Sequence, residues 1–173
     1  MTATPLVILA SARKHGDTRA FLDKVFDKLE HKQIDLLDFH ISSFDYSNNY
    51  PDTDDFLRVV DEILQHNVIV FATPVYWYAM SGLMKTFFDR WTDLLTVKKK
   101  AARELKGKSI FLLTVGVDQE LPKGFEIPFK LTSAYLNMTY QDCIYYSTKF
   151  PKTEEEIGEA IHSFTAKMKQ HYG

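Results

Sequence analysis

The stretch Val68-Ile69-Val70-Phe71-Ala72-Thr73-Pro74-Val75-Tyr76-Trp77-Tyr78 joins two different patterns. Its first half, residues 68–72, is a continuous apolar run rich in β-branched residues, which is typical of a strand covered on both faces. Its second half begins at a proline and carries three successive aromatic residues. The stretch therefore predicts a buried strand that ends in an aromatic loop.

The same alternation extends along the chain in both directions. Further strands are predicted at residues 5–10, 34–37, 109–115 and 140–146, and helical periodicity is found at residues 17–30, 53–65, 81–95, 128–137 and 153–169. Five strands that alternate with five helices indicate a parallel sheet with helices on both faces. Such sheets bind ligands at the carboxyl ends of their strands, so the loops after the first, third and fourth strands are the candidate sites.

Charge and composition argue against several classes of protein. The 173 residues carry 21 Lys and Arg against 23 Asp and Glu, a net charge of −2. A nucleic-acid-binding protein would show a basic stripe, and an electron shuttle would be strongly acidic. A membrane-spanning helix needs about 20 consecutive apolar residues, and the sequence has no such run. We therefore expect neither a nucleic-acid partner nor a membrane partner.

The chain organisation is simple. No linker, repeat or low-complexity stretch divides the sequence, which predicts a single domain over residues 1–173. Cys143 is the only cysteine and has no internal disulfide partner, which suits a reducing compartment. Residues 1–5 lack a basic leader, so a cytoplasmic location is the default expectation.

Residues 11–18, after the first predicted strand, combine groups that suit an anion. A helix N-terminus offers backbone N–H groups and a favourable dipole. Ser11 and Thr18 add hydroxyl donors, Arg13 adds a forked cation, and Gly16 permits close backbone approach. Helix capping by Asp17 or Thr18, with Arg13 simply solvated, is an equal alternative for these residues.

The loop that follows the third strand is the most specific stretch. Tyr76 and Trp77 offer flat faces and one polar donor each, which suits a flat aromatic ligand. The alternative is that these rings and Tyr78 pack on the following helix or on a partner chain. In that helix Lys85, Asp89 and Arg90 are interpreted mainly as an ion-pair row.

The fourth strand ends in Thr114-Val115-Gly116, where the backbone is expected to approach a neighbouring group closely. Phe125 is a candidate to cover a ligand, with core packing as the alternative. The six histidines include no i, i+4 pair and predict no metal site. The sequence also lacks the Gly-x-Ser-x-Gly elbow of many α/β hydrolases and the acidic cluster of a receiver domain.

Two stretches carry a family resemblance. Residues 11–18 resemble the Gly-Ser-Pro-Arg-x-x-Gly-Asn-Thr motif of the flavodoxin-like NADPH-dependent FMN reductase and NAD(P)H quinone oxidoreductase family, but Ala10, Ala12 and Asp17 replace its Gly, Pro and Asn. Residues 74–90 resemble the family's second motif, Ser-Pro-Val-Tyr-Trp followed by Ser-x-x-x-Lys-x-Phe-x-Asp-Arg. The matching positions there are Pro74, Val75, Tyr76, Trp77, Ser81, Lys85, Phe87, Asp89 and Arg90.

The resemblance implies a flavodoxin-like three-layer sandwich with strand order 2-1-3-4-5 and FMN at the carboxyl edge of the sheet. It implies that FMN contacts Ser11, Arg13, Gly16, Asp17, Thr18, Pro74, Val75, Tyr76, Trp77, Thr114, Val115 and Gly116, and that Tyr78 and Phe125 contact substrate. The implied enzyme is a homodimer that oxidises NAD(P)H and reduces a small acceptor, such as a quinone or a flavin, by a ping-pong mechanism. The flavin carries the chemistry, so no protein acid or base is expected.

Two other readings stay open at this point. A flavodoxin-type electron carrier would bind FMN without oxidising NAD(P)H. A flavin-free member of the fold is the second alternative, because the Asp17 carboxylate would repel a phosphate unless it turns away to cap the helix.

Overall fold

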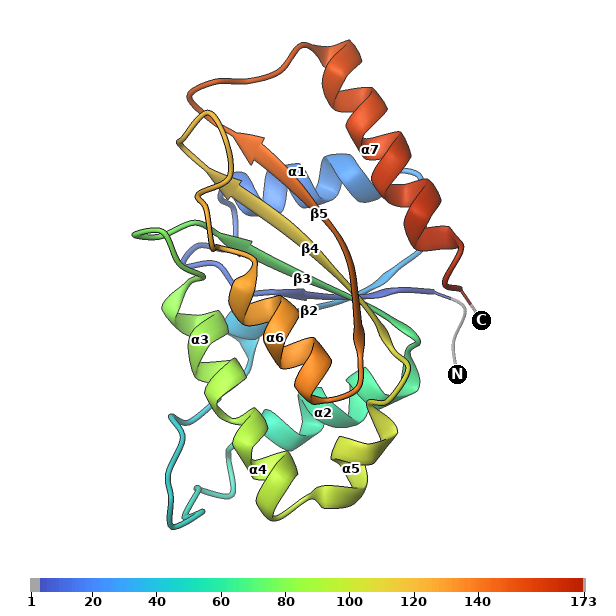
Figure 1. The fold of residues 1–173 in the computed structure, drawn as a ribbon. Coiled ribbons are helices and arrows are strands. Elements are labelled where there is room, and N and C mark those ends of the chain that lie inside the picture. The colour runs from blue at the N-terminus through green and yellow to red at the C-terminus, as the bar shows by residue number, and fades with distance from the viewer. Residues whose placement is uncertain (1–3, 173) are drawn as a thin grey trace.

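The computed structural model describes residues 4–172, so residues 1–3, which belong to the stretch expected to lack a leader, and residue 173 lie outside it. Within this part of the chain one five-stranded parallel sheet has the order β2-β1-β3-β4-β5 (Figure 1). The strands are β1 (Leu6–Leu9), β2 (Lys32–Asp35), β3 (Val68–Pro74), β4 (Ser109–Gly116) and β5 (Thr139–Ser147). The predicted flavodoxin-like architecture and strand order are confirmed.

Helices cover both faces of the sheet. They are α1 (Asp17–Phe26), α2 (Phe56–Gln65), α3 (Gly82–Asp89), α4 (Trp91–Thr96), α5 (Lys99–Glu104), α6 (Ile127–Tyr135) and α7 (Glu154–Lys169), with one 3-10 turn, η1 (Leu36–Asp38). Helices α1 and α7 lie on one face, and α2 to α6 lie on the other (Figure 1).

Alternation along each strand divides the core into two clusters. Leu6 and Ile8 of β1 belong to the cluster under α2, α3, α4 and α6, whereas Val7 and Leu9 belong to the cluster under α1 and α7. Successive strand side chains point to opposite faces. Because both faces of β1, β3 and β4 are buried, these strands have continuous apolar sequences, which made them recognisable.

Several predicted elements differ from the structure, some of them for local reasons. The second strand ends at Asp35 because its carboxylate accepts the Leu37 N–H at 3.1 Å and starts η1. The helix predicted over residues 81–95 is two helices that meet at Arg90, whose side chain turns into the protein. Helix α5 was not predicted, since its charged sequence has no buried residue.

Helix caps fix the elements around the sheet edge. The predicted capping box of α7 is confirmed: Thr153 Oγ1 accepts the Glu156 N–H at 3.2 Å, and the Glu156 carboxylate accepts the Thr153 N–H at 2.8 Å. Ser81 caps α3 by accepting the Met84 N–H at 3.1 Å, and its hydroxyl donates to the Ala10 carbonyl at 2.7 Å. Ser81 thus ties α3 to the end of β1, beside the candidate site.

None of the helices within residues 4–172 combines the length and the apolar character that crossing a bilayer requires.

Candidate functional site

The carboxyl ends of β1, β3 and β4 surround a recess of about 100 Å³. Its walls come from three loops and from the segment after β5. They comprise Ser11, Arg13, Asp17, Thr18, Pro74, Val75, Tyr76, Val115, Gly116, Val117 and Thr148. The structure therefore brings together most of the residues selected from the sequence. Val117 and Thr148 are additions to the predicted site: Val117 directly follows β4, and the Thr148 N–H donates to the Gly116 carbonyl at 2.9 Å.

One end of the recess is built for an anion. Helix α1 begins after Gly16 without a side-chain cap, so its first N–H groups have no side-chain acceptor. Ser11 and Thr18 line the recess and are only 4% and 2% exposed, and within the described residues neither hydroxyl has a hydrogen-bond partner. The side chains are buried overall, but their hydroxyl groups are accessible from the recess and are free to donate to an anion there.

The capping alternative for this loop was wrong. Asp17 is the first residue of α1 rather than its cap, and neither Asp17 nor Thr18 caps the helix with its side chain. The Asp17 carboxylate instead lies 3.5 Å from the Arg13 guanidinium, with both side chains largely exposed. An acidic group and its cation therefore share the mouth of the recess.

A strained turn adjoins the recess: Tyr76 lines it, whereas the predicted contact residues Trp77 and Tyr78 do not. The Tyr76 N–H donates to the Ala79 carbonyl at 2.9 Å and the Ala79 N–H donates to the Tyr76 carbonyl at 3.0 Å, which closes a two-residue loop. The central residues Trp77 and Tyr78 have φ values of 48° and 65°. A type I′ turn of this kind favours Asn and Gly, and bulky residues there cost about 1–3 kcal/mol each. Such strain persists mainly at functional sites.

The aromatic rings of this turn face solvent. Trp77 is 93% exposed and Tyr78 is 69% exposed, so neither ring packs on the following helix. The backbone N–H groups of Val75 and Tyr76 are engaged with Val115 and Ala79 carbonyls. Within the described residues, the N–H groups of Trp77 and Tyr78 make no hydrogen bond. The turn thus offers exposed rings and two free backbone donors at one place.

The end of β4 packs tightly against protein. A Cβ added at Gly116 would lie 2.8 Å from Tyr145 Oη and 3.3 Å from Val75 Cβ. Burial and the nearby Asp118 carboxylate raise the pKa of Tyr145, which stays neutral and donates to the Asp118 carbonyl at 2.8 Å. The close neighbour expected of Gly116 is therefore Tyr145, and the glycine permits the recess wall to form.

Two predicted contacts are corrected by the structure. The Thr114 hydroxyl donates to the Thr73 carbonyl at 2.7 Å inside the sheet, so its side chain does not line the recess. Phe125 is buried in the core, 6.0 Å between ring centroids from Phe129, and offers no surface to a substrate. Apolar content alone could not distinguish a ligand-covering Phe125 from a core residue.

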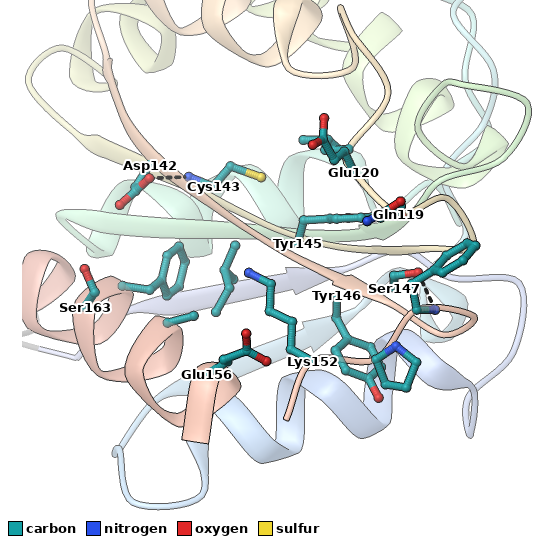
Figure 2. Close-up of a pocket in the computed structure, with 16 residues that line it drawn as sticks. Gln119, Glu120, Asp142, Cys143, Tyr145, Tyr146, Ser147, Lys152, Glu156 and Ser163 are labelled. Atoms are coloured by element: carbon teal, nitrogen blue, oxygen red, sulfur yellow. Dashed lines mark hydrogen bonds between the residues drawn. The ribbon is translucent and has the colours of Figure 1, made fainter. Parts of the chain in front are cut away.

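A larger groove of about 860 Å³ runs along the outer side of β5. Figure 2 shows Gln119, Glu120 and Tyr145 on one side of the strand and Lys152, Glu156 and Ser163 on the other. Some of its polar groups are engaged within the protein: the Asp142 carboxylate accepts the Cys143 N–H at 2.8 Å, and Ser147 Oγ accepts the Phe150 N–H at 3.1 Å.

The remaining motif residues on α3 are structural. Lys85 and Asp89 form the expected i, i+4 ion pair at 2.5 Å, while Arg90 is buried and pairs with Asp54 and Asp93.

Burial raises the pKa of the Cys143 thiol and keeps it protonated. Across residues 4–172, no group of three or more His, Cys, Asp or Glu side chains is arranged to hold a metal ion.

The recess and turn together fit FMN. A recess of about 100 Å³ is smaller than a typical ligand pocket of roughly 300–1,000 Å³. It has room for a phosphate group at α1, where the two hydroxyls and helix N–H groups lie. The exposed side chains of Tyr76–Tyr78 offer a surface next to the recess for the flat ring system. The donor set therefore matches an anionic group joined to an aromatic one.

Comparison with known proteins agrees with this geometry. A candidate NAD(P)H-dependent FMN-containing oxidoreductase, YwqN of Bacillus subtilis (strain 168), is 28% identical over 128 residues, which cover 70% of this chain and 71% of that protein. The structure of a Trp repressor binding protein from Bacillus subtilis has a TM-score of 0.70 at 23% identity, covering 94% of this chain and 97% of its own. An FMN-dependent NADH-azoreductase from Bacillus anthracis in complex with FMN has a TM-score of 0.69 at 12% identity, covering 100% of both chains. The pattern of the NADPH-dependent FMN reductase family matches residues 4–152, and the chain belongs to that FMN-binding oxidoreductase family.

Proposed function

We propose that this chain binds FMN in the recess, oxidises NAD(P)H and reduces a small acceptor such as a quinone or a flavin. The observation that carries the proposal is the strained aromatic turn Tyr76–Ala79, whose first residue lines the same recess as the uncapped start of α1. An electron carrier needs only a bound flavin. Two exposed rings held in a costly conformation suit an enzyme that admits flat substrates.

The residues divide into two groups by role. Ser11, Thr18 and the first N–H groups of α1 bind the phosphate, with Arg13 as the nearby cation. The unbonded Trp77 and Tyr78 N–H groups would donate to the polar edge of the ring system, and the Tyr76 and Trp77 side chains would lie beside it. In this proposal these groups position the cofactor and none of them transfers a proton.

Bound FMN supplies the redox chemistry by taking a hydride from NAD(P)H and giving electrons to the acceptor. In this proposal both substrates reach the flavin from the exposed side of the Tyr76–Ala79 turn. Sharing one approach requires them to bind in turn, which is the basis of ping-pong kinetics. The proposal further includes a cytoplasmic location, a single domain over residues 1–173, and no nucleic-acid or membrane partner.

A homodimer is part of the proposal. Leu131 and Tyr135 of α6 are exposed, four residues apart, beside a groove of about 320 Å³ that Phe88, Trp91 and Leu95 also line. Within the described residues Trp91 Nε1 is buried without a hydrogen-bond acceptor. A two-fold interface needs projecting and recessed features on the same patch, and this patch has both.

Anaerobic reduction tests the function. The protein loaded with FMN is mixed with NADH or NADPH without oxygen, and the absorbance of oxidised flavin is followed. We expect rapid bleaching by at least one pyridine nucleotide, and recovery of the absorbance when a quinone is then added. An FMN-loaded protein that neither nucleotide bleaches would be an electron carrier. A protein that takes up no FMN under any condition would be the flavin-free alternative.

Thr18→Val tests the phosphate site without disturbing the core. Valine replaces the hydroxyl with a methyl group of nearly the same shape, and no internal hydrogen bond is lost. A hydrogen bond to a charged group contributes about 1.5–3 kcal/mol, so FMN affinity should fall about tenfold or more. Flavin fluorescence measures the affinity, and urea unfolding should show little loss of stability. Unchanged FMN affinity in a folded variant would remove Thr18 from the site.

A further inference from the structure

We infer that Asp17 sets the affinity and phosphate selectivity of the flavin site, because its carboxylate lines the recess and pairs with the cation beside it. This inference rests on the proposed FMN site. Asp17 is the first residue of α1 and lines the recess, but its carboxylate does not accept from the N–H groups of the helix. Its partner Arg13 is the cation that lines the same recess.

The surrounding charges leave no spare cation at this edge. Arg13 is 3.5 Å from Asp17, and Arg19 donates to the Asp35 carboxylate at 3.0 Å. Lys14 forms an ion pair with Asp38. Each cation of residues 11–19 is thus matched by a carboxylate. What remains for a phosphate is a set of neutral donors: the two hydroxyls and the N–H groups of the first turn of α1.

A phosphate entering the recess therefore meets two opposing effects. It gains hydrogen bonds from neutral donors, and it is repelled by a carboxylate that also neutralises Arg13. That repulsion offsets much of what the hydroxyls contribute. The site should consequently bind FMN weakly and exchange it readily, with little preference for FMN over riboflavin, which has no phosphate.

Asp17→Asn isolates this effect. The amide keeps the size of the side chain, removes the charge and frees the Arg13 guanidinium. FMN affinity should rise about tenfold or more, while riboflavin affinity should stay unchanged, because only FMN carries the phosphate. The matched control is Asp23→Asn, the same change at an exposed position of α1 that does not line the recess. Equilibrium titration with each flavin, followed by flavin fluorescence, measures all four affinities in the two variants.

A double-mutant cycle gives a second readout. Arg13→Gln should weaken FMN binding more in the Asp17→Asn background than in the wild type, because Asp17 holds the guanidinium in the wild type. Three results would overturn the inference: equal tightening of FMN and riboflavin, equal effects of Asp17→Asn and Asp23→Asn, or weaker FMN binding by Asp17→Asn. None of these three results would contradict the proposed flavin site itself. Failure of both flavins to bind any variant would overturn the proposed function as well.

Discussion

Arg90→Met is expected to cost about 3–5 kcal/mol of unfolding free energy, since it leaves two buried carboxylates without their cation. Arg90 Nη1 lies 2.7 Å from the Asp54 carboxylate, and Arg90 Nε lies 2.7 Å from the Asp93 carboxylate. The guanidinium also stacks on the Tyr50 ring, 3.5 Å from its centroid. Arg90 thus joins the α3–α4 junction to the long connection between β2 and α2. Urea unfolding measures the loss.

Two further variants keep this prediction testable. Lys85→Met removes the cation of an exposed ion pair on the same helix and should cost less than about 1 kcal/mol. If Arg90→Met fails to fold, the triple variant Arg90→Met/Asp54→Asn/Asp93→Asn should recover folded protein, because it removes the unpaired charges. Equal losses for Arg90→Met and Lys85→Met would contradict the buried-pair explanation.

The same cluster predicts a loss of stability in acid. Burial alone would raise the pKa of the Asp54 carboxyl, but hydrogen bonds, first among them that from Arg90, outweigh it and hold this pKa below its ordinary value of 3.8. A carboxyl whose pKa is lowered by folding stabilises the protein above its unfolded-state pKa, and this contribution is lost as the pH falls through the folded-state pKa. The wild type should therefore lose stability as the pH drops below 3.8.

Trp77→Asn/Tyr78→Gly is expected to stabilise the protein and damage its function together. Asn-Gly is the preferred pair for a type I′ turn, so the change relieves two strained residues and should raise the unfolding free energy by about 1–3 kcal/mol. It also removes both exposed rings. Stacking of a flat ring on an aromatic side chain contributes about 1–3 kcal/mol, so flavin affinity should fall about tenfold or more.

Urea unfolding and flavin titration measure the two effects on the same samples. Phe150→Ala is the control, since this exposed ring lines the β5 groove and not the recess. A double variant that is less stable than the wild type would show that the turn is not strained. A more stable variant with unchanged flavin affinity would show that the Trp77 and Tyr78 side chains do not contribute to flavin binding.

The fold was predictable because the three central strands, β1, β3 and β4, are apolar on both faces. Residues 68–72 and 109–115 are continuous apolar runs, and the structure buries every residue of β3 and β4. The ends of some elements could not be predicted, because they depend on local polar interactions. The Asp35 carboxylate starts η1, and Arg90 turns inward between two helices, although apolar residues continue at helical spacing on both sides of it.

The site residues were predictable where polar side chains directly follow the end of a strand. Ser11, Arg13 and Thr18 come together at the recess because a parallel sheet gathers such loops at one edge. The conformations of Trp77 and Tyr78 were not predictable, because nothing in an aromatic sequence indicates a positive φ. The Arg13–Asp17 ion pair forms because the Asp17 carboxylate does not cap α1. The sequence offered both Asp17 and Thr18 as caps, so this pair could not be predicted.

The most direct test of the account is an equilibrium titration of the wild-type protein with FMN, in parallel with Thr18→Val. Flavin fluorescence should change saturably with one FMN bound per chain, and binding should be about tenfold or more weaker in the variant. That result would locate the flavin at the start of α1. No change in flavin fluorescence with the wild type, or equal affinity in both proteins, would contradict the assignment of the recess.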